Sequence, residues 1–127
     1  VARACFSSFD TGRNPSEADP ERFYHGFVLG LIVDLRPRYI ITSNRESGFG
    51  RYDVMLEPRD PAKDPAFIFE FKVRRPKAEA SLEDTVAAAH AQIEAKGYAQ
   101  QLIERGIPAD RIRKYGFAFE GKTVLIG

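Results

Sequence analysis

Two acidic residues and a lysine fall in neighbouring apolar segments of this chain. Asp53 lies in the segment 52–56, and Glu70 and Lys72 lie near the end of the run 66–73. Residues two apart on a strand share a face, so Glu70 and Lys72 should point the same way. Two carboxylates can hold Mg²⁺, which takes oxygen ligands at about 2.0–2.1 Å and keeps several waters. A lysine beside them can orient a water or neutralise a phosphate, so the three residues predict a divalent-cation site for phosphodiester chemistry.

The same residues also have a structural interpretation. Acids and lysines at strand ends are commonly solvated, and Glu70 and Lys72 could pair with each other. Glu70 is nevertheless surrounded by the aromatic residues of 67–71. An unpaired carboxylate is costly to bury there unless a cation or a hydrogen-bond donor meets it. The aromatic surroundings of Glu70 therefore favour a binding role more strongly than the spacing of the acids and the lysine along the sequence does.

Composition limits the class of protein. The chain has 127 residues, of which 43% are hydrophobic, and this is enough for one core. A net charge of +1 indicates neither a nucleic-acid binder nor a membrane protein, so any basic surface must come from local clusters.

A single cysteine, Cys5, excludes an intrachain disulfide and fits the cytoplasm. The apolar stretch 27–33 is too short to span a membrane. Because the chain begins at Val1, we expect an excised piece of a larger polypeptide.

The chain divides into a tail and one domain. Residues 1–19 show no sustained periodicity and predict a linker or docking tail, which leaves 20–127 as the domain. The expected elements are a helix over 19–34, strands over 38–43, 52–56 and 66–73, a long helix over 81–105, a helical turn over 108–113, and strands over 115–120 and 123–126. This order predicts an α/β fold, with an αβββαβ core, a central mixed sheet flanked by helices and an extra C-terminal strand. The long helix should connect the third and fourth strands.

Five stretches resemble the PD-(D/E)xK nuclease superfamily, in particular the branch found as the C-terminal domain of prokaryotic AAA-ATPase-like proteins. They are FYHGF (23–27), SNRESGFGRYD (43–53), FEFKV (69–73), AQI with KGY (91–98) and YGFAFEGK (115–122). Together they extend from about residue 20 to the end of the chain. The resemblance implies a restriction-endonuclease-like fold that uses Mg²⁺ or Mn²⁺. It implies DNA and an N-terminal ATPase domain as partners, and it leaves a homodimer open.

The resemblance also assigns roles by position. Asp53 resembles the metal-binding aspartate of the superfamily, Glu70 its second acid and Lys72 its lysine. Glu21 resembles the first-helix acid that completes the metal shell in some branches, although an acid in a first turn can also serve the helix dipole. Gln92 resembles the second-helix glutamine that often faces the site. Tyr52 replaces the proline of the motif name, which is a minor departure.

Four basic residues are candidates for nucleic-acid binding, although a solvated surface position is the alternative for each. They are Arg51, Arg74, Arg75 and Lys96. Lys96 follows Gln92 by one helical turn and should lie on the same helix face. The sequence thus predicts a nuclease that cleaves by attack of a metal-activated water. The alternative is a catalytically silent regulatory module that binds nucleic acid or protein and is attached to an AAA-type ATPase.

Overall fold

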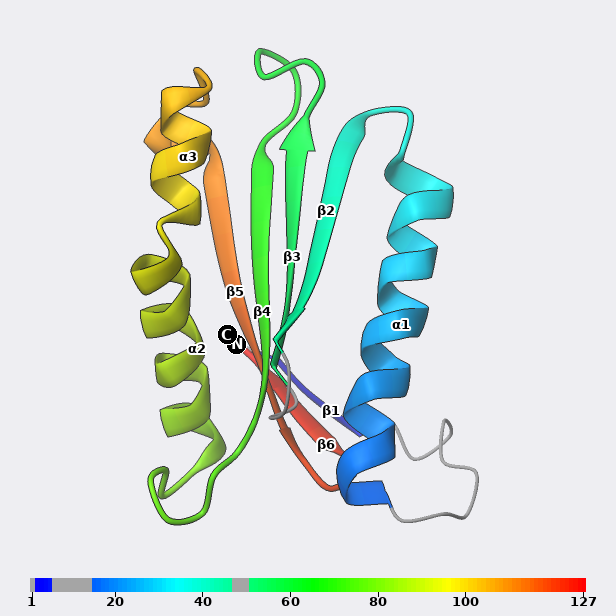
Figure 1. The fold of residues 1–127 in the computed structure, drawn as a ribbon, viewed down its shortest axis with the longest axis vertical. Coiled ribbons are helices and arrows are strands. Elements are labelled where there is room, and N and C mark those ends of the chain that lie inside the picture. Colours follow the sequence, from blue (N-terminus) through cyan, green and yellow to red (C-terminus); the bar gives the residue numbers. More distant parts are fainter. Residues whose placement is uncertain (1, 6–14, 47–50) are drawn as a thin grey trace.

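The structure, a computed structural model, describes residues 2–5, 15–46 and 51–127, with side chains from residue 22 onwards except for residue 46. Its elements are β1 (Ala2–Cys5), α1 (Pro15–Leu35), β2 (Tyr39–Glu46), β3 (Arg51–Pro58), β4 (Ala66–Val73), α2 (Leu82–Lys96), α3 (Tyr98–Glu104), η2 (Ala109–Arg111), β5 (Ile112–Glu120) and β6 (Thr123–Ile126). The six strands form one sheet in the order β1-β6-β5-β4-β3-β2. Helix α1 lies on one face of the sheet, and α2 and α3 lie on the other (Figure 1).

The predicted α/β fold is confirmed. Strands β2, β3 and β4 are antiparallel neighbours, whereas β4 and β5 are parallel and α2 connects them, as expected for an αβββαβ core. The extra C-terminal strand β6 is also present. It follows β5 through a tight turn, in which Gly121 has a φ of 58° that a residue with a side chain rarely adopts.

The segment 1–19, expected as a linker or docking tail, contains regular elements. Residues 2–5 form β1, which pairs antiparallel with β6 and places Ala2 opposite Ile126. These residues show no clear strand pattern of their own, and the pairing depends on the exposed edge that β6 offers. Helix α1 begins at Pro15, four residues before the start expected at residue 19. Proline suits a first turn because the N–H that it lacks would have no partner there.

The helix expected over 81–105 is interrupted at Gly97. Gly97 has a φ of 68°, and its N–H donates to the carbonyl of Glu94, which ends α2. The chain then continues as the separate helix α3, which follows α2 on the same face of the sheet (Figure 1). None of the described helices is long and apolar enough to cross a membrane.

Two different cores lie on the two faces of the sheet. The alternation predicted for 66–73 is confirmed, because Phe69 and Phe71 face α1 whereas Ile68 and Glu70 face α2. The α1 side is aromatic, and the rings of Phe71 and Phe117 stack with centroids 4.6 Å apart. The α2 side is aliphatic and is built from Met55, Ala66, Ile68, Ile93, Leu102 and Ile107. The polar residues of β3 and β4 therefore open onto the α2 side.

Candidate active site

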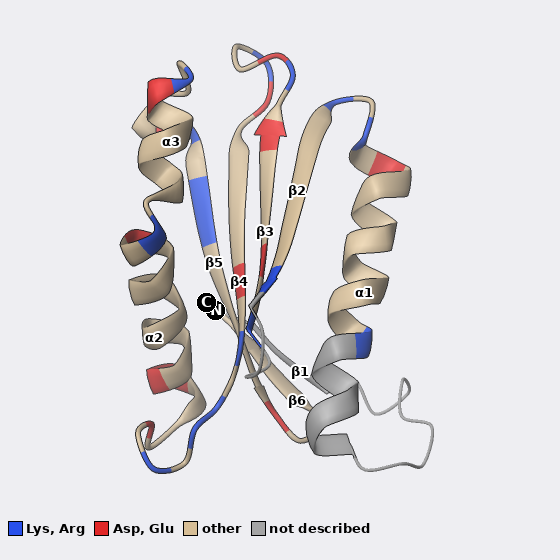
Figure 2. Cartoon of the chain, viewed as in Figure 1, with Lys and Arg blue, Asp and Glu red and all other residues tan. Residues whose placement is uncertain are grey.

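Asp53 and Glu70 lie directly opposite each other on β3 and β4. Their side chains face α2, and the residues are only 1% and 0% exposed. Figure 2 shows acidic segments on both strands within the sheet. Two carboxylates in such a cross-strand pair repel each other, and burial makes each charge costly. A positive group between them would relieve both costs.

Lys96, the last residue of α2, supplies that positive group. Its Nζ lies 2.7 Å from Asp53 Oδ2, and 3.2 Å and 3.4 Å from the two carboxylate oxygens of Glu70. The Lys96 side chain is 13% exposed, so the ammonium sits at the boundary between the carboxylates and solvent. The residue predicted to bind nucleic acid thus contacts both predicted metal ligands.

Asn44 and Tyr98 complete the surroundings of Asp53. The Asn44 amide donates to Asp53 Oδ1 at 3.1 Å, and the Tyr98 hydroxyl donates to Asp53 Oδ2 at 3.2 Å. Burial, reinforced by the negative charge of Asp53, raises the pKa of Tyr98 and keeps its hydroxyl protonated as a donor. The turn at Gly97 places Tyr98 next to Lys96 but outside the regular path of α2. Each oxygen of Asp53 therefore has a fixed donor.

Sequence reasoning assigned no role to Asn44 or Tyr98, although both fall within the stretches that carry the family resemblance. A register argument could have found Asn44, because it lies opposite Asp53 on β2. Tyr98 could not be found in this way. Its contact depends on the left-handed turn at Gly97, which the helical periodicity of 81–105 does not reveal.

Lys72 is buried, but its ammonium pairs with Glu79, a residue of the loop between β4 and α2. The Thr85 hydroxyl and the Arg75 N–H each donate to Glu79 Oε1 at 2.9 Å. Burial by itself would raise the pKa of Glu79, but the hydrogen bonds from Lys72, Arg75 and Thr85 lower it below its usual value. The sequence did not indicate this ion pair with Glu79; the role of Lys72 beside the acids and its alternative pair with Glu70 both stay predictions.

The other predicted site residues have different surroundings. Arg51 of β3 donates to the side-chain oxygen of Gln92 of α2 at 3.3 Å. These two residues therefore meet beside the carboxylates of Asp53 and Glu70. Arg74 pairs with Glu120 and donates to two carbonyls of the loop that follows it, which gives it a structural role. Arg75 is exposed. Glu21 belongs to α1, and its side chain lies outside the described residues.

Gly116 allows α2 to lie close to this site. It is the register partner of Glu70 on β5. A Cβ atom added there would lie 3.0 Å from Ala89 Cβ and 3.1 Å from the carbonyl oxygen of Val86, both on α2. The missing side chain at Gly116 thus sets the distance between α2 and the sheet, and with it the reach of Lys96.

The site fits a hard divalent cation in its donor chemistry. Oxygens of Asp53 and Glu70 converge on one positively charged atom, the Nζ of Lys96, and carboxylate oxygens are preferred ligands of Mg²⁺. Among the described side chains, no cluster of three or more His, Cys, Asp or Glu residues forms a metal site. Mg²⁺ is commonly held by one or two carboxylates and several waters, so two acids are sufficient.

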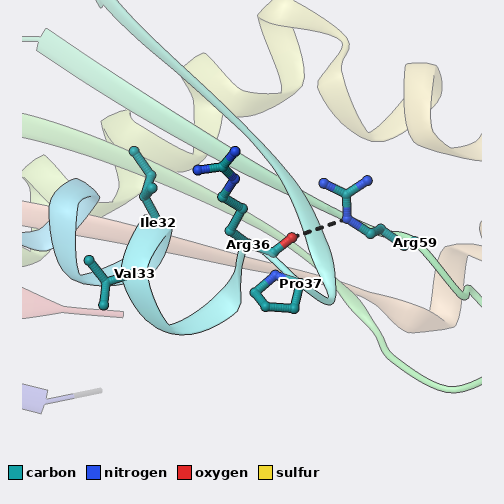
Figure 3. A pocket seen from close by; sticks show the side chains of 5 residues that line it. All are labelled: Ile32, Val33, Arg36, Pro37 and Arg59. Carbon is teal, nitrogen blue, oxygen red and sulfur yellow. Dashed lines mark hydrogen bonds between the residues drawn. The ribbon is translucent and has the colours of Figure 1, made fainter.

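A separate groove lies where α1 turns into β2 (Figure 3). It is lined by Ile32, Val33, Arg36, Pro37 and Arg59, and Arg59 Nε donates to the carbonyl of Arg36 at 3.1 Å. This lining contains no carboxylate, histidine or hydroxyl group. The groove therefore offers apolar and cationic contacts but no group for hydrolysis.

Comparison with known proteins gives one match. A family model of the PD-(D/E)XK nuclease superfamily matches residues 19–127, which include nearly all of α1 and every later element. No curated protein and no solved structure matches the chain. The match covers both opposed carboxylates and the αβββαβ core that carries them, and we conclude that the chain belongs to the PD-(D/E)XK nuclease superfamily.

Proposed function

We propose that this chain is a metal-dependent nuclease that hydrolyses phosphodiester bonds of DNA. One observation carries the proposal: two buried carboxylates on adjacent strands converge on a single cationic position that remains partly open to solvent. The superfamily supports hydrolysis of nucleic acid with divalent metals. DNA is the finer choice, and it rests on the resemblance of the five sequence stretches.

The residues would share the work as follows. Asp53 and Glu70 would hold Mg²⁺ or Mn²⁺, and the resemblance adds Glu21 of α1, which would have to reach them from the other face of the sheet (Figure 1). The bound ion supplies Lewis acidity and lowers the pKa of a water, which is the chemistry that phosphodiester hydrolysis requires. Asn44 and Tyr98 fix the orientation of the Asp53 carboxylate through their hydrogen bonds. Fixed ligands need no reorganisation when the substrate arrives.

The remaining polar residues contact the substrate in this proposal. Arg51 and Gln92 bind its backbone beside the carboxylates, where their mutual hydrogen bond holds both side chains in place. Exposed Arg75 provides a phosphate contact. Lys72 neutralises charge at the reacting phosphate, which requires it to leave Glu79 when DNA binds.

The setting of the domain is also part of the proposal. Resemblance to the C-terminal domains of AAA-ATPase-like proteins suggests an ATPase domain in the same polypeptide as the partner. A cytoplasmic location fits the single cysteine. The ATPase would deliver DNA to a nuclease domain that has little net charge of its own.

The proposal is tested by titrating Mn²⁺ into the purified protein by calorimetry and assaying the same samples for nicking of DNA. The double variant Asp53→Ala, Glu70→Ala should lose both metal binding and metal-dependent nicking. Glu57→Ala is the matched control, because Glu57 is another acid of β3 but pairs with Arg105. Undiminished nicking by the double variant would refute the assignment.

A second candidate function is a regulatory module that binds without cleaving. The pair between Lys72 and Glu79 favours it, because the ammonium of the motif's lysine is already engaged by a carboxylate other than Asp53 or Glu70. In that case the unmodified protein would bind DNA in the presence of Mn²⁺ but would not nick it. The nicking assay separates the two candidates directly.

A further inference from the structure

We infer that Lys96 and the divalent cation compete for the same two carboxylates, so that binding of the metal ejects the Lys96 ammonium from the site. The inference rests on the proposed metal site and adds a role that the resemblance does not assign. In the absence of metal, the Lys96 ammonium acts as the counter-cation of the two carboxylates, and the metal replaces it on binding.

The first argument is the position of the ammonium. Lys96 Nζ contacts Asp53 Oδ2 and both oxygens of Glu70 at 2.7–3.4 Å. A metal ion held by these carboxylates would need the same oxygens. An ammonium and a divalent cation at this position disfavour each other, because like charges repel at this range and the hydrogen bonds from Lys96 occupy lone pairs that the metal would use.

The second argument is that the buried carboxylate pair is stabilised by a positive charge whether or not the metal is bound. Asp53 and Glu70 are opposed across β3 and β4 and are almost completely buried. Without a cation, the two carboxylates would repel each other at a desolvated position. Lys96 satisfies this need by reaching the pair from the last turn of α2.

The third argument is that Lys96 can leave. Its side chain is 13% exposed, whereas that of Lys72 is 6% exposed. A lysine has a long flexible stem, and its head can move into water while the stem keeps its packing. Once displaced, the Lys96 ammonium would remain at the mouth of the site, where it could contact the phosphate of a substrate.

The test compares Mn²⁺ binding by the unmodified protein, Lys96→Met and the control Lys114→Met. Methionine keeps the length of the stem but removes the charge. Lys114 is a second lysine on the α2 side, and its ammonium contacts Glu94 at 2.7 Å, away from the carboxylate pair. We expect Lys96→Met to bind Mn²⁺ at least about tenfold more tightly than the unmodified protein, and Lys114→Met to bind it equally well.

Thermal unfolding of the same samples gives a second readout. In EDTA, the melting temperature of Lys96→Met should be lower by about 5 °C or more, because the carboxylates lose their counter-cation. Saturating Mn²⁺ should raise it by more than it raises that of the unmodified protein, because tighter binding stabilises the folded state further. Lys114→Met should behave like the unmodified protein in both conditions.

The outcomes separate this inference from the proposed function. Equal or weaker Mn²⁺ binding by Lys96→Met, together with loss of binding in Asp53→Ala, would overturn the competition and leave the metal site standing. If neither the unmodified protein nor Lys96→Met binds Mn²⁺, the metal site falls, and the competition falls with it.

If Lys96→Met does not fold, the inference can be tested on the unmodified protein by measuring how readily each lysine is acylated. An amine-reactive reagent is applied with and without saturating Mn²⁺, and each lysine is quantified by mass spectrometry. The reactivity of Lys96 should rise severalfold with Mn²⁺, whereas that of Lys72 should not change, because its partner is Glu79. An unchanged reactivity of Lys96 at saturating Mn²⁺ would overturn the inference.

Discussion

Glu79 controls the position of Lys72. Its carboxylate receives the Lys72 ammonium, the Thr85 hydroxyl and the Arg75 N–H, and both charged side chains of the pair are less than 10% exposed. Breaking a buried pair leaves an uncompensated charge, which is more costly than losing an exposed ion pair. The lysine of the motif is thus held in a buried ion pair with Glu79.

Replacing Glu79 by Gln should destabilise the fold at neutral pH by about 3–5 kcal/mol, because Lys72 would be buried without a counter-charge. The pKa of Glu79 is below its usual value of 4.5. Its charged form therefore stabilises the fold above pH 4.5, and this contribution disappears as the pH falls through the lower folded-state pKa. Urea unfolding curves of the two proteins should differ most at pH 7 and converge below pH 4.5.

Exposed Glu104 of α3 provides the control for this substitution. Glu104→Gln should change the free energy of unfolding by less than about 0.5 kcal/mol at either pH. A difference between the unmodified protein and Glu79→Gln that stayed constant from pH 7 to acid would show that the carboxylate charge is not the source of the stability.

At the scale of elements, Gly97 converts one expected helix into two. The sequence predicted a continuous helix because glycine inside a helix costs only about 1 kcal/mol relative to alanine and the apolar spacing continues past it. After the break at Gly97, the Tyr98 hydroxyl contacts Asp53 and Leu102 of α3 packs in the aliphatic core. Such a contact depends on tertiary packing, which local propensity cannot register.

The strands were more predictable than the helix break. Phe67, Phe69 and Phe71 alternate with Ile68, Glu70 and Lys72, and this period of two specifies which side chains share a face. Opposition of Asp53 and Glu70 follows once β3 and β4 pair in the observed register. The approach of Lys96 also required the path of α2 over β5, which depends on the small residue Gly116.

Replacing Gly97 by Ala tests whether its left-handed conformation is required. No atom lies within 4 Å of the added Cβ, so the cost is conformational, about 1–2 kcal/mol in the free energy of unfolding. Gly26→Ala is the control, because Gly26 has the same open space but lies within α1. Alanine there should stabilise the fold by about 0.5–1 kcal/mol. Chemical denaturation measures both changes, and opposite signs are expected.

At the scale of the whole molecule, the two ends of the chain close one edge of the sheet. Strand β1 pairs with β6 through four residues, and β6 in turn pairs with β5. The candidate site lies on β3 and β4, nearer the other edge. The strands that complete one edge of the sheet, β1 and β6, are thus different from the strands that carry the carboxylates, β3 and β4.

Deleting residues 1–5 should reduce stability without changing the site. Loss of the β1–β6 ladder should lower the free energy of unfolding by about 1–3 kcal/mol, because a few net backbone hydrogen bonds are lost. The exposed edge of β6 should also promote association between molecules, which light scattering can detect. Mn²⁺ affinity by calorimetry should remain unchanged, because β5 and β6 stand between β1 and the strand of Glu70. A large loss of Mn²⁺ affinity in a folded truncated protein would show that the N-terminal strand also organises the carboxylates.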